Sequence, residues 1–125
     1  MKWVAIENQT QPLARPVWAG YCDSFFCQLR GFTFRKKIGD EEALLLVQGR
    51  DSRLDSSIHM LFVWTDLAVV WMDARLDVVD VRRAKRWRPG YVPARPARYV
   101  LELAPGRFNE FKVGDRLAIV EARLT

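Results

Sequence analysis

The sequence predicts a mainly β domain, a compact β-sandwich or jelly-roll-like barrel with one or two short helices. Three observations predict this class. Apolar residues alternate or run together in about eight short segments, as in strands. Turn-forming pairs such as Pro89-Gly90 and Gly114-Asp115 separate these segments. The one clear helical pattern is brief. At 125 residues, the chain is expected to be a single domain, 1–125.

The first elements are two strands and a helix. Trp3 to Glu7 is short and mostly apolar, and Leu13 to Tyr21 is a second extended candidate. Asp23 or Ser24 can cap the following helix, which is predicted to stop at Gly31.

The middle of the chain predicts four strands. They are Ala43 to Val47, Ile58 to Val63, Leu67 to Met72 and Leu76 to Val81. A polar loop is expected over 48–57. Leu67 to Met72 is apolar at every position, which is typical of a strand covered on both faces.

The C-terminal part begins with a proline-rich segment, Arg82 to Arg98, that is predicted to be a loop. Tyr99 to Leu103 alternates as a half-buried strand, Phe108 to Phe111 is expected to form one helical turn, and Leu117 to Val120 is the last strand. The predicted core includes Leu45, Val47, Val69, Trp71, Val79, Leu101 and Ile119.

The expected compartment is the cytoplasm, because the sequence shows neither a signal peptide nor about twenty consecutive apolar residues that could span a membrane. Cys22 and Cys27 are then expected to be free thiols, since a helix would place residues five apart on different faces. The pattern predicts no metal site and no cofactor. The net charge of +5 is compatible with weak attraction to nucleic acid.

Three segments carry family-like motifs: FFCQLRGFTFR at 25–35, SSIHMLFVWTDLAVVWMD at 56–73, and RPARYVLELAPG at 95–106 followed by VGDRL. Together they resemble the uncharacterised prokaryotic family known as domain of unknown function 192. The resemblance implies a compact β fold and no particular activity. It also implies a carboxylate at position 68, where this chain has Ala68, so Asp66 is the candidate replacement.

The leading functional hypothesis is a non-catalytic domain that binds a small ligand or a partner. His59, the only histidine, is expected to meet Arg35 and Arg98 in one pocket for a small anionic or polyhydroxylated ligand, with Asp66 as the nearest acid. A small enzyme using His59 with Asp66 or Asp73 is a further alternative, although no nucleophile motif accompanies the histidine.

The other alternative is an accessory protein that binds nucleic acid weakly through the basic segment 82–98. This segment carries seven cations and no acid, so the cations could contact phosphates while aromatic rings stack on bases. A solvated structural loop is the competing interpretation. The candidate residues are Arg82, Arg83, Lys85, Arg86, Trp87, Arg88 and Tyr91.

Overall fold

Seven strands and one short helix form the fold in the computed structural model, which describes residues 2–24, 27–28, 31–32, 37–60, 62–88 and 90–121. The mainly β class is therefore confirmed. In this part of the chain, no helix has the length and apolar character needed to cross a membrane. The strands are β1 Trp3–Asn8, β2 Val17–Cys22, β3 Glu42–Ser52, β4 Leu67–Met72, β5 Val78–Ala84, β6 Ala97–Leu103 and β7 Leu117–Glu121, and the 3-10 helix is η1 Pro105–Glu110.

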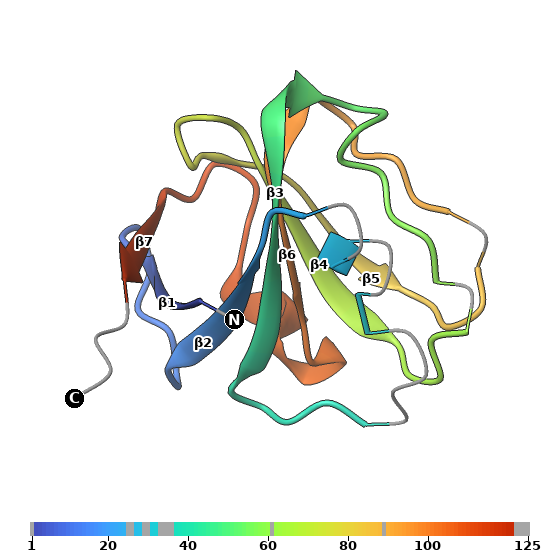
Figure 1. Ribbon diagram of the computed structural model, residues 1–125. Coiled ribbons are helices and arrows are strands. Elements are labelled where there is room, and N and C mark those ends of the chain that lie inside the picture. The colour runs from blue at the N-terminus through green and yellow to red at the C-terminus, as the bar shows by residue number, and fades with distance from the viewer. Residues whose placement is uncertain are drawn as a thin grey trace.

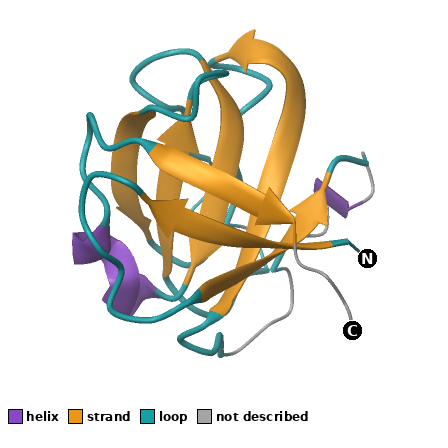
Figure 2. Ribbon diagram, turned by 90° about the vertical axis from the view of Figure 1, so that its left-hand side faces the viewer, coloured by secondary structure: helices purple, strands orange, loops and turns teal. Residues whose placement is uncertain are grey.

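The strands make one sheet in the order β5-β4-β6-β3-β2-β1-β7 (Figure 1). β2 and β3 pair in parallel, and the other neighbours are antiparallel. The sheet is strongly curved, as Figure 2 shows, and its two edge strands come together at one end. At this meeting Asp77 and Arg116 form a β-bridge, and the Leu117 amide donates to the Leu76 carbonyl at 2.9 Å. The result is a barrel-like fold rather than two separate sheets.

β4 lies in the middle of this packing, and all six of its residues are buried. Its side chains alternate between two apolar clusters, as the two faces of a strand require. Ala68, Val70 and Met72 join the interior of the barrel, while Val69 and Trp71 face the opposite side. The prediction that this strand is covered on both faces is confirmed.

The two clusters are named here the inner core and the outer core. The inner core gathers residues from all seven strands, including Leu45 and Leu101. The outer core lies on the other face of β3, β4 and β6, under the connections that follow β2, β3 and β5. All seven predicted core residues lie in or against one of these clusters, with Val47, Val79 and Ile119 only partly buried.

One strand prediction is wrong, and one loop prediction has the wrong bounds. Ile58 to Val63 makes only an isolated bridge between Ile58 and Tyr91, because the chain turns at Phe62, whose φ is 61°. The predicted polar loop 48–57 is also too long, since β3 continues to Ser52.

The helix predicted after β2 has helical residues at 27–28; Phe25, Phe26 and Leu29 lie outside the described residues. At its start, Ser24 Oγ accepts a hydrogen bond from the Cys27 amide at 3.2 Å. Gly31 has a φ of 47°, and its amide donates to the Cys27 carbonyl at 2.9 Å.

Candidate functional site

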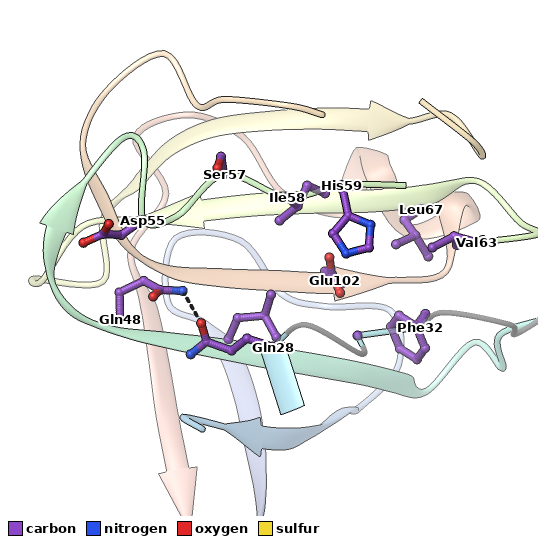
Figure 3. A pocket seen from close by; sticks show the side chains of 12 residues that line it. Gln28, Phe32, Gln48, Asp55, Ser57, Ile58, His59, Val63, Leu67 and Glu102 are labelled. Carbon is purple, nitrogen blue, oxygen red and sulfur yellow. Dashed lines mark hydrogen bonds between the residues drawn. The ribbon is translucent and has the colours of Figure 1, made fainter. Parts of the chain in front are cut away.

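A small polar cavity opens into the outer core, between β3, β6 and the two connections that cover them (Figure 3). Its volume is about 60 Å³. Its polar side chains are those of His59, Glu102, Gln28, Gln48, Asp55 and Ser57. The apolar wall consists of Phe32, Leu46, Ile58, Val63 and Leu67.

Glu102 is the most unusual of these residues. It follows the alternation of β6: Leu101 and Leu103 fill the inner core, so the side chain of Glu102 must point to the outer one. It is only 4% exposed. Within the described chain, its Oε1 atom is buried without a hydrogen-bond partner. Burial disfavours the charged form and raises the pKa of this carboxyl to about 7.

His59 faces this carboxyl. In Figure 3 its ring points toward Glu102 across the cavity. Backbone hydrogen bonds hold the histidine on both sides, because Ile58 pairs with Tyr91 and the Met60 amide donates to the Arg88 carbonyl at 2.9 Å. The site therefore places the ring of a histidine opposite a buried carboxyl whose pKa is raised to about 7.

A pair of glutamines forms the adjacent wall. Gln48 Nε2 donates to Gln28 Oε1 at 2.9 Å, and Gln28 Nε2 donates in turn to the carbonyls of Val47 at 2.8 Å and Cys22 at 3.2 Å. Gln28 thus ties the connection after β2 to β3. On the same connection, a Cβ atom at Gly31 would lie 3.5 Å from Glu102 Oε1.

Cys22 and Cys27 form a disulfide at the base of this connection, with their Cα atoms 5.6 Å apart. The prediction of free thiols is wrong for a geometric reason. It placed both cysteines on one helix, but Cys22 ends β2 and only Cys27 lies in the helical turn. The disulfide fixes the segment that carries Gln28 beside the cavity.

The predicted ligand residues go to different places. Of the four, His59 lines the cavity, and Arg35 lies outside the described residues. Arg98 donates from Nε to the Gln48 carbonyl at 3.2 Å and lies over the Tyr99 ring. Asp66 accepts a hydrogen bond from the Arg86 amide at 3.0 Å. Neither Arg98 nor Asp66 is among the lining residues.

Asp73, the other acid considered for an enzyme, lies in the hairpin between β4 and β5. Its Oδ1 atom accepts hydrogen bonds from the amides of Arg75 and Asp77. It shapes that turn and does not line the cavity. Across the described residues, no group of three or more His, Cys, Asp or Glu side chains could hold a metal ion.

The basic segment is only partly a loop. Arg82 and Arg83 belong to β5, and Arg98 belongs to β6. The prediction of one loop over 82–98 is corrected accordingly, because strand pairing with β4 continues to Ala84 before the prolines intervene. Arg82 pairs with Asp80 at 2.9 Å, and the Arg83 guanidinium lies over the Phe108 ring.

The remaining members of the segment form the connection that covers the outer core. The Lys85 amide donates a hydrogen bond to the Tyr91 hydroxyl oxygen at 2.8 Å, which ties the start of this connection to Tyr91. Arg86 pairs with Asp66, with Nε and Oδ1 3.9 Å apart. Trp87 is exposed and contacts the rings of Phe62 and Trp64.

Sequence reasoning missed Glu102 as a site residue and missed Phe62 and Trp64 as companions of Trp87. A signal existed for Glu102, since it is a carboxylate between two leucines at the end of an otherwise largely apolar predicted strand. No comparable signal marked the aromatic residues, because their contacts depend on how the two connections pair.

Comparisons with known proteins agree with this fold. The model of the DUF192 family, described as Uncharacterized ACR, matches residues 5–119. A UPF0127 protein of Thermococcus gammatolerans is 39% identical over 79% of this chain, and the match spans 65% of that protein, so less than two thirds of its length.

Two solved structures share the architecture. A protein of unknown function from Novosphingobium aromaticivorans has a TM-score of 0.78 at 18% identity, covering 93% of this chain and 83% of that one. A candidate transcription regulator from Sinorhizobium meliloti has a TM-score of 0.80 at 16% identity, covering 94% and 92%. At these identities the likeness concerns the fold alone. With a family match over nearly its whole length, the chain belongs to the DUF192 family of uncharacterised proteins.

Proposed function

We propose that this protein is a ligand-binding β domain whose site is the cavity between His59 and Glu102. One observation carries the proposal: a carboxyl oxygen of Glu102 is buried without a hydrogen-bond partner in the described chain. Buried polar atoms nearly always have a partner, and an exception calls for an explanation. A ligand that donates a hydrogen bond to this oxygen supplies it.

The chemistry of the wall favours a ligand that carries hydroxyl or amino groups. Glu102 accepts hydrogen bonds in both protonation states, and its pKa of about 7 leaves a substantial charged fraction at neutral pH. The Glu102 carboxylate would repel a negatively charged ligand group. Of the two ligand classes that the sequence predicts, the polyhydroxylated class therefore fits better than the anionic one.

The size of the cavity limits what enters it. A volume of about 60 Å³ corresponds to about four to six water-sized positions. Ordinary small-molecule pockets measure about 300–1,000 Å³. The cavity therefore suits one small donor group, either a very small molecule or the end of a larger one.

Three probes matched in size test this proposal by NMR titration: ethylene glycol, ethanolamine and acetate. Ethylene glycol and ethanolamine should shift the amide signals of Gly31, Leu46 and Glu102 in a saturable manner, and acetate should not. Spectra followed over hours also report whether either compound is chemically changed, which would favour the enzyme alternative.

Variants at the carboxyl sharpen the test. Glu102→Leu should abolish the shifts, because it removes the hydrogen-bond acceptor and replaces it with an apolar side chain of similar size. Glu102→Gln should retain ethylene glycol but weaken ethanolamine, since the charge is lost. Glu41→Gln, which removes an exposed carboxylate, is the matched control and should bind as the unchanged protein does. Absence of saturable shifts, or unchanged binding in Glu102→Leu, would refute the proposal.

A further inference from the structure

An exposed aromatic cluster lies on the connections that follow β3 and β5, and none of its residues lines the cavity. It consists of Phe62, Trp64 and Trp87, which are 49%, 44% and 40% exposed. The Trp87 ring centroid lies 5.2 Å from that of Phe62 and 4.9 Å from that of Trp64, both in edge-to-face arrangements. Each of the three residues therefore remains at least 40% exposed despite these contacts.

The backbone under this cluster is strained. Phe62 has a φ of 61° and Trp87 a φ of 66°, and bulky side chains rarely adopt this left-handed region. Apart from Leu76, they are the only non-glycine residues in the described chain with positive φ. Burial does not offset this strain, because both rings remain exposed. Such strain gathers at ligand-binding sites.

The same connections fix the two strained residues against each other. The Met60 carbonyl accepts hydrogen bonds from the amides of Trp87, at 2.8 Å, and Val63, at 3.2 Å. Met60 itself is fully buried in the outer core. The rings are therefore held on a rigid base, which lowers the entropy cost of binding a partner.

Positive charge borders the cluster. Lys85, Arg86 and Arg88 are exposed and surround Trp87 in sequence. Arg86 pairs with Asp66, whereas Lys85 and Arg88 have no ion pair among the described residues. The surface thus combines accessible aromatic faces with at least two available cations.

We propose that this surface binds single-stranded nucleic acid, with unpaired bases stacking on Trp64 and Trp87 and phosphates contacting Lys85 and Arg88. Stacking needs no particular base, so the binding is sequence-tolerant. Two phosphate contacts predict a slope of log affinity against log salt of about −1.4. Raising the salt from about 50 to about 200 mM should then lower the affinity about sevenfold.

The test is fluorescence anisotropy with labelled oligothymidine of about 12 nucleotides, a length within the usual range of single-strand sites. A duplex of the same length and vesicles containing phosphatidylserine are measured in parallel. We expect binding to the oligothymidine to exceed binding to either of the others, and to weaken with salt as above.

Two sets of variants separate stacking from charge. Trp87→Asn should lower the affinity at least about fivefold. It should not lower the melting temperature, because asparagine tolerates the left-handed backbone. Lys85→Gln with Arg88→Gln should flatten the salt dependence. The matched control is Arg75→Gln with Lys112→Gln, which also removes one arginine and one lysine charge. Arg75 precedes the start of β5, whereas Lys85 follows its end.

No binding to the oligothymidine at low salt would overturn the proposal. So would an equal effect of the two charge variants, or full binding by Trp87→Asn. Binding to vesicles without binding to the oligothymidine would overturn it as well and would identify a membrane-facing surface instead.

Discussion

Glu102 shows how one side chain can make the stability of the whole protein depend on pH. Its carboxyl is surrounded by the outer core, and burial raises its pKa from 4.5 to about 7. A raised pKa means that the folded state holds its proton more tightly than the unfolded state does. The associated stability is fully present below about pH 4.5 and is lost as the pH rises through about 7.

Replacing Glu102 with glutamine should therefore remove this pH dependence. Glutamine resembles the protonated acid, so the variant and the unchanged protein should have similar free energies of unfolding near pH 4.5. At about pH 8.5, the variant should be more stable by up to about 3 kcal/mol, since one pKa unit corresponds to about 1.4 kcal/mol. Urea unfolding at the two pH values measures the difference. An equal loss of stability in both proteins would show that another group titrates.

Trp71 is the residue on which the outer core most depends. Its side chain is fully buried, its Nε1 atom donates to the Ser56 carbonyl at 2.8 Å, and the Arg82 guanidinium lies over its ring. Trp71→Ala should lower the free energy of unfolding by about 3–5 kcal/mol. Trp18→Ala is the control, because that ring is 45% exposed and its loss should cost less than about 1 kcal/mol. Equal losses in the two variants would contradict the assignment.

At the scale of elements, periodicity predicts strands well where both faces are buried. β4 is recognised because its run of six residues is apolar at every position, and a run of this length is typical of a strand buried on both faces. The segment 58–63 is almost as apolar, with His59 as its one polar residue, but it turns at Phe62 and packs over the sheet as a connection. Apolar character reports that a segment is buried and does not report whether it pairs in a sheet. This is why one strand prediction is confirmed and the other is wrong.

The candidate site follows the same logic. His59 was recognisable from its residue type, because it is the only histidine of the chain. Asp66 was chosen for its nearness in sequence, yet its carboxylate binds the Arg86 amide on another connection. Glu102 comes from a strand 43 positions later and faces His59 only because β6 lies beside β3 and β4. Contacts of this kind depend on strand order, which local patterns do not contain.

The connection after β2 depends on its disulfide. Thiol titration of the unfolded protein without reductant should find no free thiols. Reduction, or the pair Cys22→Ser and Cys27→Ser, should lower stability by about 2 kcal/mol for so short a loop. Thermal unfolding with and without reductant measures this loss. Finding both thiols free before reduction would contradict the disulfide. In the thermal unfolding measurement, the Glu41→Gln control should unfold as the unchanged protein does.

At the scale of the whole molecule, charged side chains hold together segments that are far apart in sequence. Arg116 pairs with Asp77 at 2.8 Å where β5 and β7 meet, and this pairing lowers the pKa of Asp77. Arg107, in η1, connects more segments than Arg116 does, and its side chain is almost fully buried. Its guanidinium donates to the carbonyls of Arg15, Pro16 and Asp40 and to both oxygens of Glu110.

The fold class was predictable at this scale, but the closure of the sheet was not. The mainly β class follows from apolar periodicity, which is local, although periodicity predicts about eight strands and the structure has seven. The meeting of β5 with β7 and the buried position of Arg107 depend on contacts between residues far apart in sequence. An arginine beside Pro105-Gly106 in a turn gives no sign that it will be buried, because arginine is usually exposed.

Arg107→Met should therefore destabilise the whole fold, by on the order of 3 kcal/mol, because it leaves Glu110 and three carbonyls without the hydrogen bonds that Arg107 donates.

The pH dependence of the free energy of unfolding identifies the cause of this loss. The hydrogen bond from Arg107 lowers the pKa of Glu110, so the stability from this pair is present above the ordinary glutamate pKa of 4.5 and is lost as the pH falls through the lowered value. In Arg107→Met this acid-side loss should shrink. Adding Glu110→Leu should recover part of the stability at neutral pH, because the uncompensated carboxylate is then gone. Urea unfolding at about pH 7 and about pH 3 measures both effects. An unchanged acid-side loss in Arg107→Met would show that the arginine acts only through its contacts with the carbonyls.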